Sequence, residues 1–321
     1  MRARAAFLIP AALLALATTR SAAVDDDYPN RTIRLIVPFT AGSGPDQIAR
    51  LLGQYLQENM GQTVVVEDHA GALGSIAAQE VARSAPDGYT LLLGTNTTHA
   101  SNVAMLKNLS YDPVKDFAPI IRTSTTAQVL LVKPDFPAQT LAEFMTYARA
   151  HPGLTAGFGS GAAQISIAQL QSRGGLSLVT ASYRGIPQAV ADVMGGVISL
   201  SFADLSVSIP QMRGGTLRGV GVTSPERNEL IPDLPALAEA MPGFRTGIWY
   251  GLFAPTHTPD AIVNKLYAVS EKFLTMPATR NKLAAVGVST APLPPTEFSA
   301  FVRSEIARWT ADAKEAGIEA N

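Results

Sequence analysis

The sequence contains no cysteine, which excludes disulfides, thiolate chemistry and a lipid anchor on an N-terminal cysteine. Aromatic residues make up 7% of the chain, and its charges nearly balance, with 25 lysines and arginines against 26 aspartates and glutamates. No stretch carries a block of like charge. Because nucleic-acid binding needs a basic face or a platform of aromatic side chains, it is not expected.

The N-terminus has the parts of a secretory signal peptide. Arg2 and Arg4 form a basic start, residues 5–17 are almost entirely apolar, and Ser21-Ala22-Ala23 offers small residues for cleavage. A membrane anchor is the alternative, but the apolar run is too short to span a bilayer. We predict that residues 1–23 are removed, which changes the formal net charge from −1 to −4. In a bacterium, such an exported chain would be free in the periplasm.

The length of 321 residues and the hydrophobic fraction of 47% suggest about two domains. Apolar strands alternate with helices, a pattern typical of a parallel sheet covered on both faces. We predict that the chain crosses into a second domain at residues 120–133 and returns at 217–223. The predicted divisions are a signal peptide of 1–23, a first domain of 24–124 and 226–321, and a second domain of 125–225.

The first strand-loop-helix unit carries the clearest sign of a binding site. Residues 33–39 read as a strand, Thr40-Ala41-Gly42-Ser43-Gly44 as a loop, and Pro45-Asp46 as the start of a helix, where proline is tolerated. Free backbone N–H groups at such a start favour an anion. A tight turn without a ligand is the alternative, but open α/β sheets place their sites at the carboxyl ends of strands. We therefore predict that this loop forms half of the binding site for a small carboxylate.

A second predicted strand, residues 89–94, runs into a polar loop. Thr95, Thr97 and Thr98 supply hydroxyl donors that suit a carboxylate, although a solvated loop would have the same composition. His99 could donate in a cleft or be an ordinary satisfied histidine. The four histidines show no metal-ligand spacing, so no metal site is expected.

Seven motifs follow one another along the mature chain: YPNRTIRLIVPFTAGSGPDQIARLL, VVVEDHAGALGSIAA, APDGYTLLLGT, YDPVKDFAPI, YRGIPQAVADVMGG, LRGVGVTSPERNELIPDLPALAEA and WYGLFAPTHTP. Together they span nearly all of it and resemble the Bug family, the periplasmic solute receptors of tripartite tricarboxylate transporters. The resemblance implies an α/β fold of the Venus-flytrap type, in which two domains are joined by two crossing strands that act as a hinge. The ligand would lie in the cleft between them.

The resemblance also implies where the ligand is held. In the family, two loops of the first domain hold the carboxylate of an organic acid, an aromatic acid or an amino acid through backbone amides, hydroxyls and water. The second domain closes over it. Carried over to this chain, and with the residue-level arguments above, the candidate ligand-binding residues are Thr40, Ala41, Gly42, Ser43, Gly44, Asp46, Thr95, Thr97, Thr98, His99, Ser160, Gly161, Gln164, Tyr183, Phe202 and Asp204.

Two departures from the family pattern fall on the second-domain side. Many members have a longer, more glycine-rich loop at residues 159–164, and many read F-D-N where this chain has Phe202-Ala203-Asp204. Both positions are expected to touch the variable end of the ligand. The resemblance therefore implies a carboxylate but does not name the acid.

Several candidates have an alternative interpretation. Asp46 suits the first turn of a helix as well as a ligand contact, Asp204 could cap the helix after it, and Tyr183 and Phe202 could be core aromatics. If Asp204 faces the cleft, it would favour a ligand with an ammonium or hydroxyl group and oppose a second carboxylate. Arg184 could pair with a distal carboxylate or with Asp204.

Ser160 raises the possibility of an enzyme. It lies in Gly159-Ser160-Gly161, but the nucleophile elbow G-x-S-x-G is absent, and a triad with His99 and Asp204 would have to converge from different domains. We predict instead a monomeric periplasmic receptor that performs no chemistry and needs no cofactor. It would bind a small carboxylate, close by a hinge motion and dock on membrane permease subunits implied by the resemblance. A secreted serine hydrolase and a sensor that presents its ligand are the alternatives.

Overall fold

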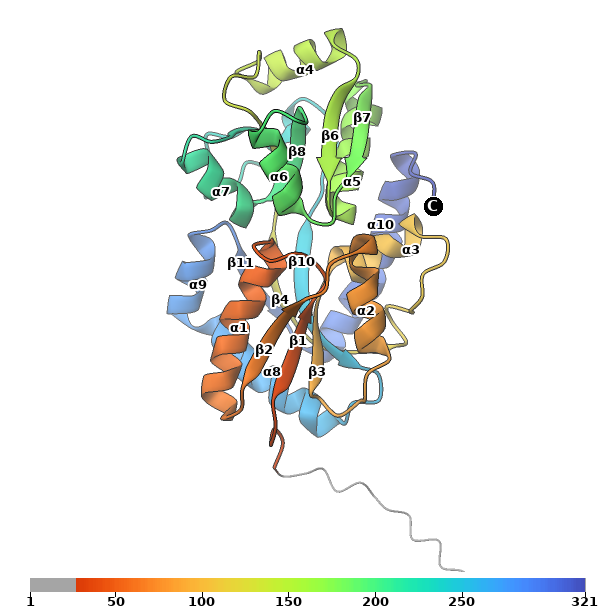
Figure 1. The fold of residues 1–321 in the computed structure, drawn as a ribbon, viewed down its shortest axis with the longest axis vertical. Helices are drawn as coiled ribbons and strands as arrows, with labels where there is room; N and C mark the ends of the chain where they lie inside the picture. The colour runs from red at the N-terminus through yellow and green to blue at the C-terminus, as the bar shows by residue number, and fades with distance from the viewer. Residues whose placement is uncertain (1–26, 321) are drawn as a thin grey trace, which may run out of the picture.

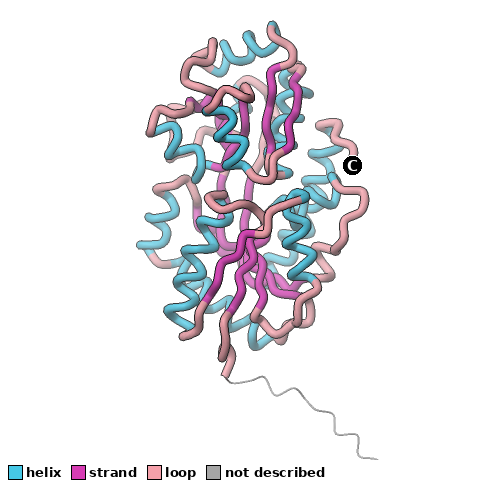
Figure 2. The backbone as a smooth tube through the Cα atoms, viewed as in Figure 1, coloured by secondary structure: helices cyan, strands magenta, loops and turns pink. Residues whose placement is uncertain are grey.

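The computed structural model describes residues 27–320, and the predicted signal peptide lies outside these residues. Two α/β lobes lie one above the other along the long axis of the molecule (Figure 1). In each lobe helices flank a central group of strands (Figure 2). None of the helices within residues 27–320 is both long and apolar enough to cross a membrane.

The first lobe is built on a six-stranded sheet in the order β11-β4-β10-β3-β1-β2. Strand β1 pairs in parallel with β2 and β3, whereas β10 runs antiparallel to both β3 and β4. The prediction of a parallel sheet is therefore wrong. The physical reason is that β4 leaves for the other lobe and β10 returns from it, so the two must run in opposite directions. The strands are β1 (Ile33–Val37), β2 (Val64–Asp68), β3 (Thr90–Thr95), β4 (Phe117–Thr126), β10 (Ile248–Pro255) and β11 (Ser289–Leu293).

The second lobe is built on a five-stranded sheet in the order β7-β6-β8-β5-β9. Strand β6 is parallel to β7 and β8, and β5 is antiparallel to β8 and β9. This sheet is mixed as well. Its strands are β5 (Gln128–Val132), β6 (Leu154–Phe158), β7 (Leu178–Ser182), β8 (Leu200–Asp204) and β9 (Arg218–Val222).

The helices begin and end close to the positions that the sequence predicts. In α1, Pro45 occupies the first turn and Gly61 ends the helix at φ 72°, a conformation that suits glycine. In α4, Thr140 and Glu143 form a reciprocal capping box. The first lobe contains α1 (Gly44–Met60), η1 (Ala72–Gly74), α2 (Ser75–Ala82), η2 (Thr97–Ser101), α3 (Asn102–Met105), α8 (Asp260–Thr275), α9 (Pro277–Ala284) and α10 (Pro295–Glu315). The second contains α4 (Leu141–Ala150), α5 (Gly161–Gly174), α6 (Ile186–Met194), α7 (Leu205–Arg213) and η3 (Leu237–Glu239).

Two short segments connect the lobes. The outgoing one is Ala127, between β4 and β5. The predicted return at residues 217–223 is wrong, because β9 pairs with β5 as an edge strand of the second sheet. The chain re-enters the first sheet only at Ile248, opposite Thr126.

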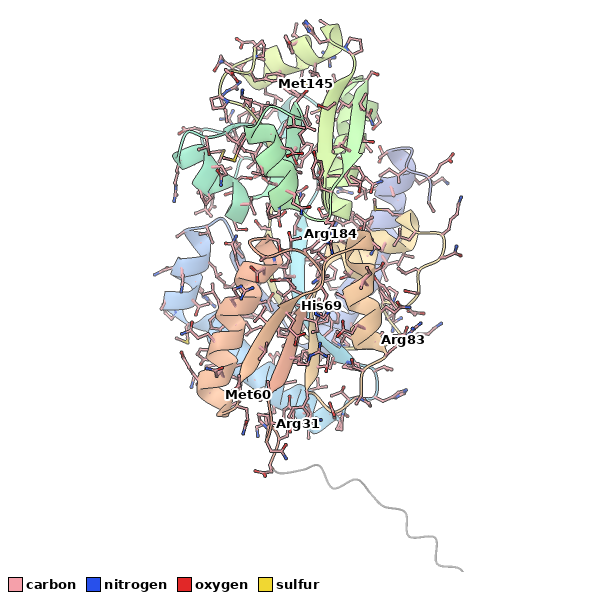
Figure 3. The ribbon with its side chains drawn as sticks, viewed as in Figure 1. Arg31, Met60, His69, Arg83, Met145 and Arg184 are labelled. Atoms are coloured by element: carbon pink, nitrogen blue, oxygen red, sulfur yellow. The ribbon has the colours of Figure 1, made fainter. Side chains whose placement is uncertain are left out.

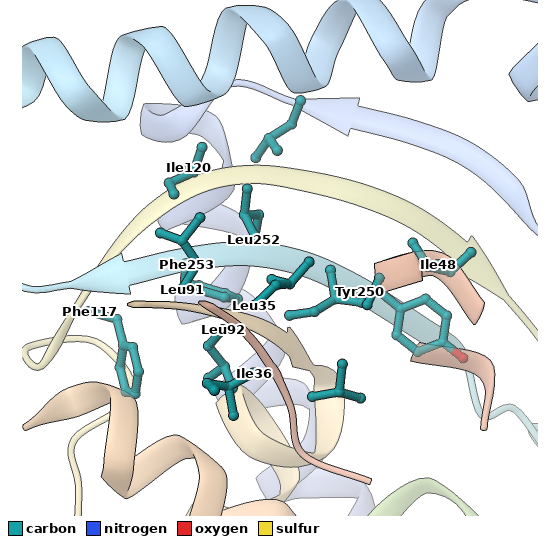
Figure 4. Close-up of a cluster of buried hydrophobic side chains, with 14 of the residues drawn as sticks. Leu35, Ile36, Ile48, Leu91, Leu92, Phe117, Ile120, Tyr250, Leu252 and Phe253 are labelled. Atoms are coloured by element: carbon teal, nitrogen blue, oxygen red, sulfur yellow. The ribbon is translucent and has the colours of Figure 1, made fainter. Parts of the chain in front are cut away.

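Each lobe has its own apolar core. Figure 4 shows part of the first, in which side chains of β1, β3 and β10 pack together, with the hydroxyl of Tyr250 at its edge. In the second core, Leu237 and Phe244 pack with the strands of the five-stranded sheet. We therefore propose that the second domain ends at about Gly247 and not at residue 225, because these contacts place Leu237 and Phe244 in the second core.

Candidate ligand-binding site

A cavity lies between the two lobes, at the carboxyl ends of β1, β3, β6 and β8. It leaves about 350 Å³ of space between the surrounding atoms, part of which is open to solvent. The first lobe contributes Phe39, Ser43, Gly44, Pro45, Thr95, Asn96, Thr97, Ile248 and Tyr250, and the second contributes Ser160, Ala162, Ile186 and Asp204.

Helix N-termini converge on this cavity from both lobes. Helices α1 and η2 begin at its edge in the first lobe, and α5, α6 and α7 begin at its edge in the second. Each start leaves backbone N–H groups without intrahelical partners and carries a partial positive charge. This arrangement follows from the repeated strand-loop-helix order, because each strand ends where the next helix starts. It makes the cavity suitable for an anion.

Two polar side chains of the cavity lining carry hydrogen-bond donors that have no partner among the described residues. Ser43 is 3% exposed and Asn96 is 1% exposed, and within the described residues neither Ser43 Oγ nor Asn96 Nδ2 has a hydrogen-bond partner. A buried donor without a partner costs roughly 1–3 kcal/mol. A ligand with acceptor oxygens would satisfy both.

Asp204 is the charged residue of the cavity lining among residues 27–320. It occupies the position before α7, but its side chain makes no capping hydrogen bond, so the alternative of a helix cap is wrong. Instead its Oδ2 accepts from the Tyr250 hydroxyl at 2.5 Å, and its Oδ1 accepts from Gln128 Nε2 at 3.3 Å. Burial is the main cause that raises the pKa of this carboxyl.

Ser160 and Gly161 begin α5 at the cavity. Ser160 Oγ accepts from the Ala163 backbone N–H at 3.2 Å, which leaves its own proton free to donate. The Gly161 N–H donates across the lobes to Thr97 Oγ1 at 3.2 Å. Ser160 therefore lines the cavity, whereas Gly161 lies outside the lining and links the two lobes.

The predicted polar loop at residues 95–99 is instead the end of β3 followed directly by η2. Thr95 Oγ1 accepts from the Thr97 N–H at 3.1 Å, and Thr98 Oγ1 accepts from the Thr95 N–H at 3.0 Å, so the hydroxyls turn the chain into a helix. Thr95 and Thr97 line the cavity, and Thr98 does not.

His99 lies in the first core rather than in the cavity. Its ring stacks on Phe253 with centroids 3.8 Å apart, and its Nδ1 bonds with Thr98 Oγ1 at 2.9 Å. Burial lowers the pKa of His99 to about 3. Because the His99 imidazole is enclosed in the first core and forms no hydrogen bond with Ser160 within the described residues, it cannot act as the base of Ser160, so the alternative of a Ser160 triad is contradicted. Within the described residues, no cluster of three or more histidine and carboxylate side chains could hold a metal ion.

Several other predicted residues lie outside the cavity lining. Ala41 and Gly42 are exposed, and Asp46 shapes their loop by accepting from the Gly42 N–H at 2.8 Å and pairing with Arg50 at 2.7 Å. Thr40 packs against Gly185 of the second lobe. Phe202 is fully buried in the second core against Phe244.

A second, open hollow between the lobes contains Gln164, Tyr183 and Arg184. The Tyr183 hydroxyl donates to Asp192 at 2.7 Å, and Arg184 Nη2 donates to the Ala70 carbonyl at 3.3 Å. Arg184 lies at the boundary between the lobes (Figure 3) but does not pair with Asp204. Gln164 and Tyr183 were predicted as ligand contacts, and the structure separates them from the enclosed cavity.

Sequence reasoning missed several lining residues. Asn96 stands between two threonines that were named, and its polar side chain was a usable signal. Tyr250 lies on the returning strand, 46 positions from its partner Asp204, and no local pattern indicates that pairing. The apolar lining residues Phe39, Pro45, Ala162, Ile186 and Ile248 have the same types as core residues.

The comparisons with known proteins agree with the two-lobed α/β fold. Residues 48–318 match the sequence model of the tripartite tricarboxylate transporter family receptor. Among solved structures, the periplasmic binding protein BugD is 30% identical with a TM-score of 0.88, covering 92% of this chain and 100% of that one. The R. palustris protein Rpa4515 with adipate is 33% identical, with a TM-score of 0.89 and the same coverage. MatC from Rhodopseudomonas palustris with bound malate is 32% identical, with a TM-score of 0.83 and coverage of 89% and 99%.

Proposed function

The chain belongs to the tripartite tricarboxylate transporter receptor family, a family of non-enzymatic periplasmic solute-binding receptors that includes the Bug proteins, and from this premise we propose its ligand and its partner. The ligand is a small organic acid, held by a carboxylate in the cavity between the lobes. The partner is the membrane permease of a tripartite transporter, which receives the acid from the closed receptor.

One observation supports the ligand most strongly: two buried donors without partners, Ser43 Oγ and Asn96 Nδ2, lie where helix N-termini converge. A carboxylate has two oxygens and accepts up to about four hydrogen bonds, so it matches this set of donors. Two similar solved structures, Rpa4515 with adipate and MatC with bound malate, contain carboxylates. A neutral sugar or a cation would leave the positive helix ends without a counter-charge.

The order of the binding steps follows from the division of the site between the two lobes. The first lobe presents Ser43 at the start of α1 and Asn96 at the start of η2, so it would take up the carboxylate first. The second lobe would then add Ser160 and Asp204 and exclude water, with rotation at Ala127 and Gly247. We further propose that residues 1–23 direct export and are cleaved near Ala23, which delivers the receptor to the periplasm as a monomer.

The proposal is tested with the mature protein and a panel of small carboxylates in a thermal-shift screen, followed by calorimetric titration of the acids that raise the unfolding temperature. Ser43→Ala should weaken the best acid about 10- to 150-fold, because a hydrogen bond to a charged group contributes about 1.5–3 kcal/mol. Ser270→Ala is a matched control, since Ser270 Oγ in α8 is also buried without a partner but lies away from the cavity.

The Ser270→Ala protein should bind like the wild type. If no carboxylate stabilises the wild-type protein, the proposed ligand class is wrong. If acids bind but Ser43→Ala binds them equally well, the carboxylate is held elsewhere.

A further inference from the structure

We propose that Asp204 restricts this receptor to small acids that carry a hydrogen-bond donor, a hydroxyl or an ammonium group, beside the bound carboxylate. The inference rests on the proposed function and specifies which acids the cavity accepts. Plain monocarboxylates and dicarboxylates of the same length would bind less well.

Asp204 faces the start of α1, the segment that we propose holds the carboxylate of the ligand. A β-carbon built on Gly44, at the start of α1, would lie 2.6 Å from Asp204 Oδ2 and 3.3 Å from Ser206 Oγ. The carboxyl group of the second lobe therefore faces the same helix start that presents Ser43. Because Ser43 and Asp204 line the same cavity, the proposal places the atoms next to the bound carboxylate within reach of Asp204.

Asp204 cannot turn away from the ligand, because a buried network fixes its orientation. Gln128 donates to Asp204 Oδ1, and Gln128 Oε1 accepts from Ser166 Oγ at 3.2 Å. Ser166 also bonds to Thr246 Oγ1 at 2.9 Å. These side chains are fully buried, and two of them adjoin the segments Ala127 and Gly247 that connect the lobes. Rotating Asp204 out of the cavity would break this network and leave buried polar atoms without partners.

The partners of Asp204 make it an acceptor toward the ligand. Both Tyr250 and Gln128 donate to it, and a carboxylate accepts up to about four hydrogen bonds, so Asp204 keeps acceptor capacity at the cavity lining for a further donor. A ligand hydroxyl or ammonium group supplies that donor, whereas a methylene group leaves the carboxylate unsatisfied.

No cation in the cavity would offset a second carboxylate next to Asp204. Among the described residues, the lining contains no lysine, arginine or histidine. Arg184, in the outer hollow, is engaged by the Ala70 carbonyl. A second ligand carboxylate placed beside Asp204 would therefore bring two like charges together in an enclosed space, which disfavours that ligand.

The test compares acids that differ by one group, by calorimetric titration of the mature protein: glycolate with acetate, malate with succinate, and aspartate with succinate. We expect the donor-bearing acid of at least one pair to bind at least tenfold more tightly to the wild type. In Asp204→Asn the ratio should fall at least fivefold, because the neutral amide accepts more weakly from a hydroxyl or ammonium group than the carboxylate does. Asp192→Asn, which alters a carboxylate that also accepts from a tyrosine but lies outside the cavity lining, is the matched control and should keep the wild-type ratio.

Wild-type ratios within twofold for all pairs would overturn this inference whether or not the variant folds. An unchanged ratio in Asp204→Asn, with a normal unfolding transition, would overturn it too. In both cases acids still bind, so the proposed function stands. Absence of binding to every carboxylate would overturn the proposed function and this inference together.

Discussion

Replacing Gly161 with alanine should hold the two lobes apart without unfolding either. Gly161 is the first residue of α5, and its φ lies outside the left-handed region, so its own backbone accepts alanine. The added β-carbon would overlap Ser101 Oγ and would lie 3.2 Å from Thr97 Cγ2 and 3.3 Å from Met105 Sδ. All three atoms belong to the first lobe, so the overlap arises only when the lobes are closed.

The size of the effect follows from the cost of overpacking. Extra atoms in a packed interface cost about 1–3 kcal/mol, which lowers the population of the closed state about 5- to 150-fold. If ligand binding requires closure, the apparent Kd rises by the same factor. The unfolding midpoint of the ligand-free protein should change little, because each lobe keeps its own core.

The assay is calorimetric titration with the best acid, together with urea unfolding without ligand. A second substitution makes the test specific: Ser101→Ala removes the overlapping oxygen, whose one hydrogen bond, to the Thr97 carbonyl, is long at 3.5 Å. The double variant Gly161→Ala with Ser101→Ala should recover most of the lost affinity. Gly195→Ala, in the same lobe with no neighbour closer than 3.5 Å to an added β-carbon, is the control. Wild-type affinity in Gly161→Ala would refute closure through this contact.

Two further predictions concern buried groups away from the ligand. Because the pKa of His99 is lowered to about 3 in the folded protein and is near 6.5 when unfolded, only the unfolded chain gains this proton as the pH falls from 6.5. The His99 contribution to the free energy of unfolding is therefore complete above pH 6.5 and falls by about 2 kcal/mol by pH 5. Urea unfolding at pH 7 and at pH 5 should therefore show a smaller loss of free energy of unfolding in His99→Phe than in the wild type. Equal losses in the two proteins would contradict this prediction. Glu305→Ala should lower the free energy of unfolding by about 3 kcal/mol, because it removes the acceptor of Trp249 Nε1 (2.8 Å) and the partner of Arg308 (2.6 Å). Glu239→Ala, which breaks an exposed pair with Arg227, should lower the free energy of unfolding much less. Comparable losses in the two variants would contradict the idea that burial makes the Glu305 contacts the more stabilising ones.

Much of the fold could be read from local patterns. The apolar strand predicted at residues 33–39 and the proline at the start of α1 are short-range features, and the structure has the strand at Ile33–Val37 and Pro45 in the first turn of α1. Strand β11 was missed because its sequence, STAPL, lacks an apolar run and pairs only as an edge strand beside β4. The direction of β10 was also beyond local reasoning, since it depends on how the chain returns from the other lobe.

Local patterns in the sequence likewise predicted only part of the site. Its loop at Ser43 and Gly44 follows from a strand that ends at a helix start, and both residues line the cavity. His99 was named because it adjoins polar threonines, yet its ring turns into the apolar core against Phe253. The orientation of a side chain beyond a strand end depends on what packs around it, and the residues around His99 come from β10, about 150 positions later.

The sequence by itself determined that strands would end at helix starts, and therefore that donors for an anion would gather at the strand ends. It also indicated the family, through short patterns in fixed order. Only the tertiary structure decided which residues of the two lobes meet. Tyr250 reaches Asp204, and Gly161 reaches Thr97, because two crossing segments bring the lobes face to face. Such contacts depend on the relative placement of whole lobes, which no spacing along the chain encodes.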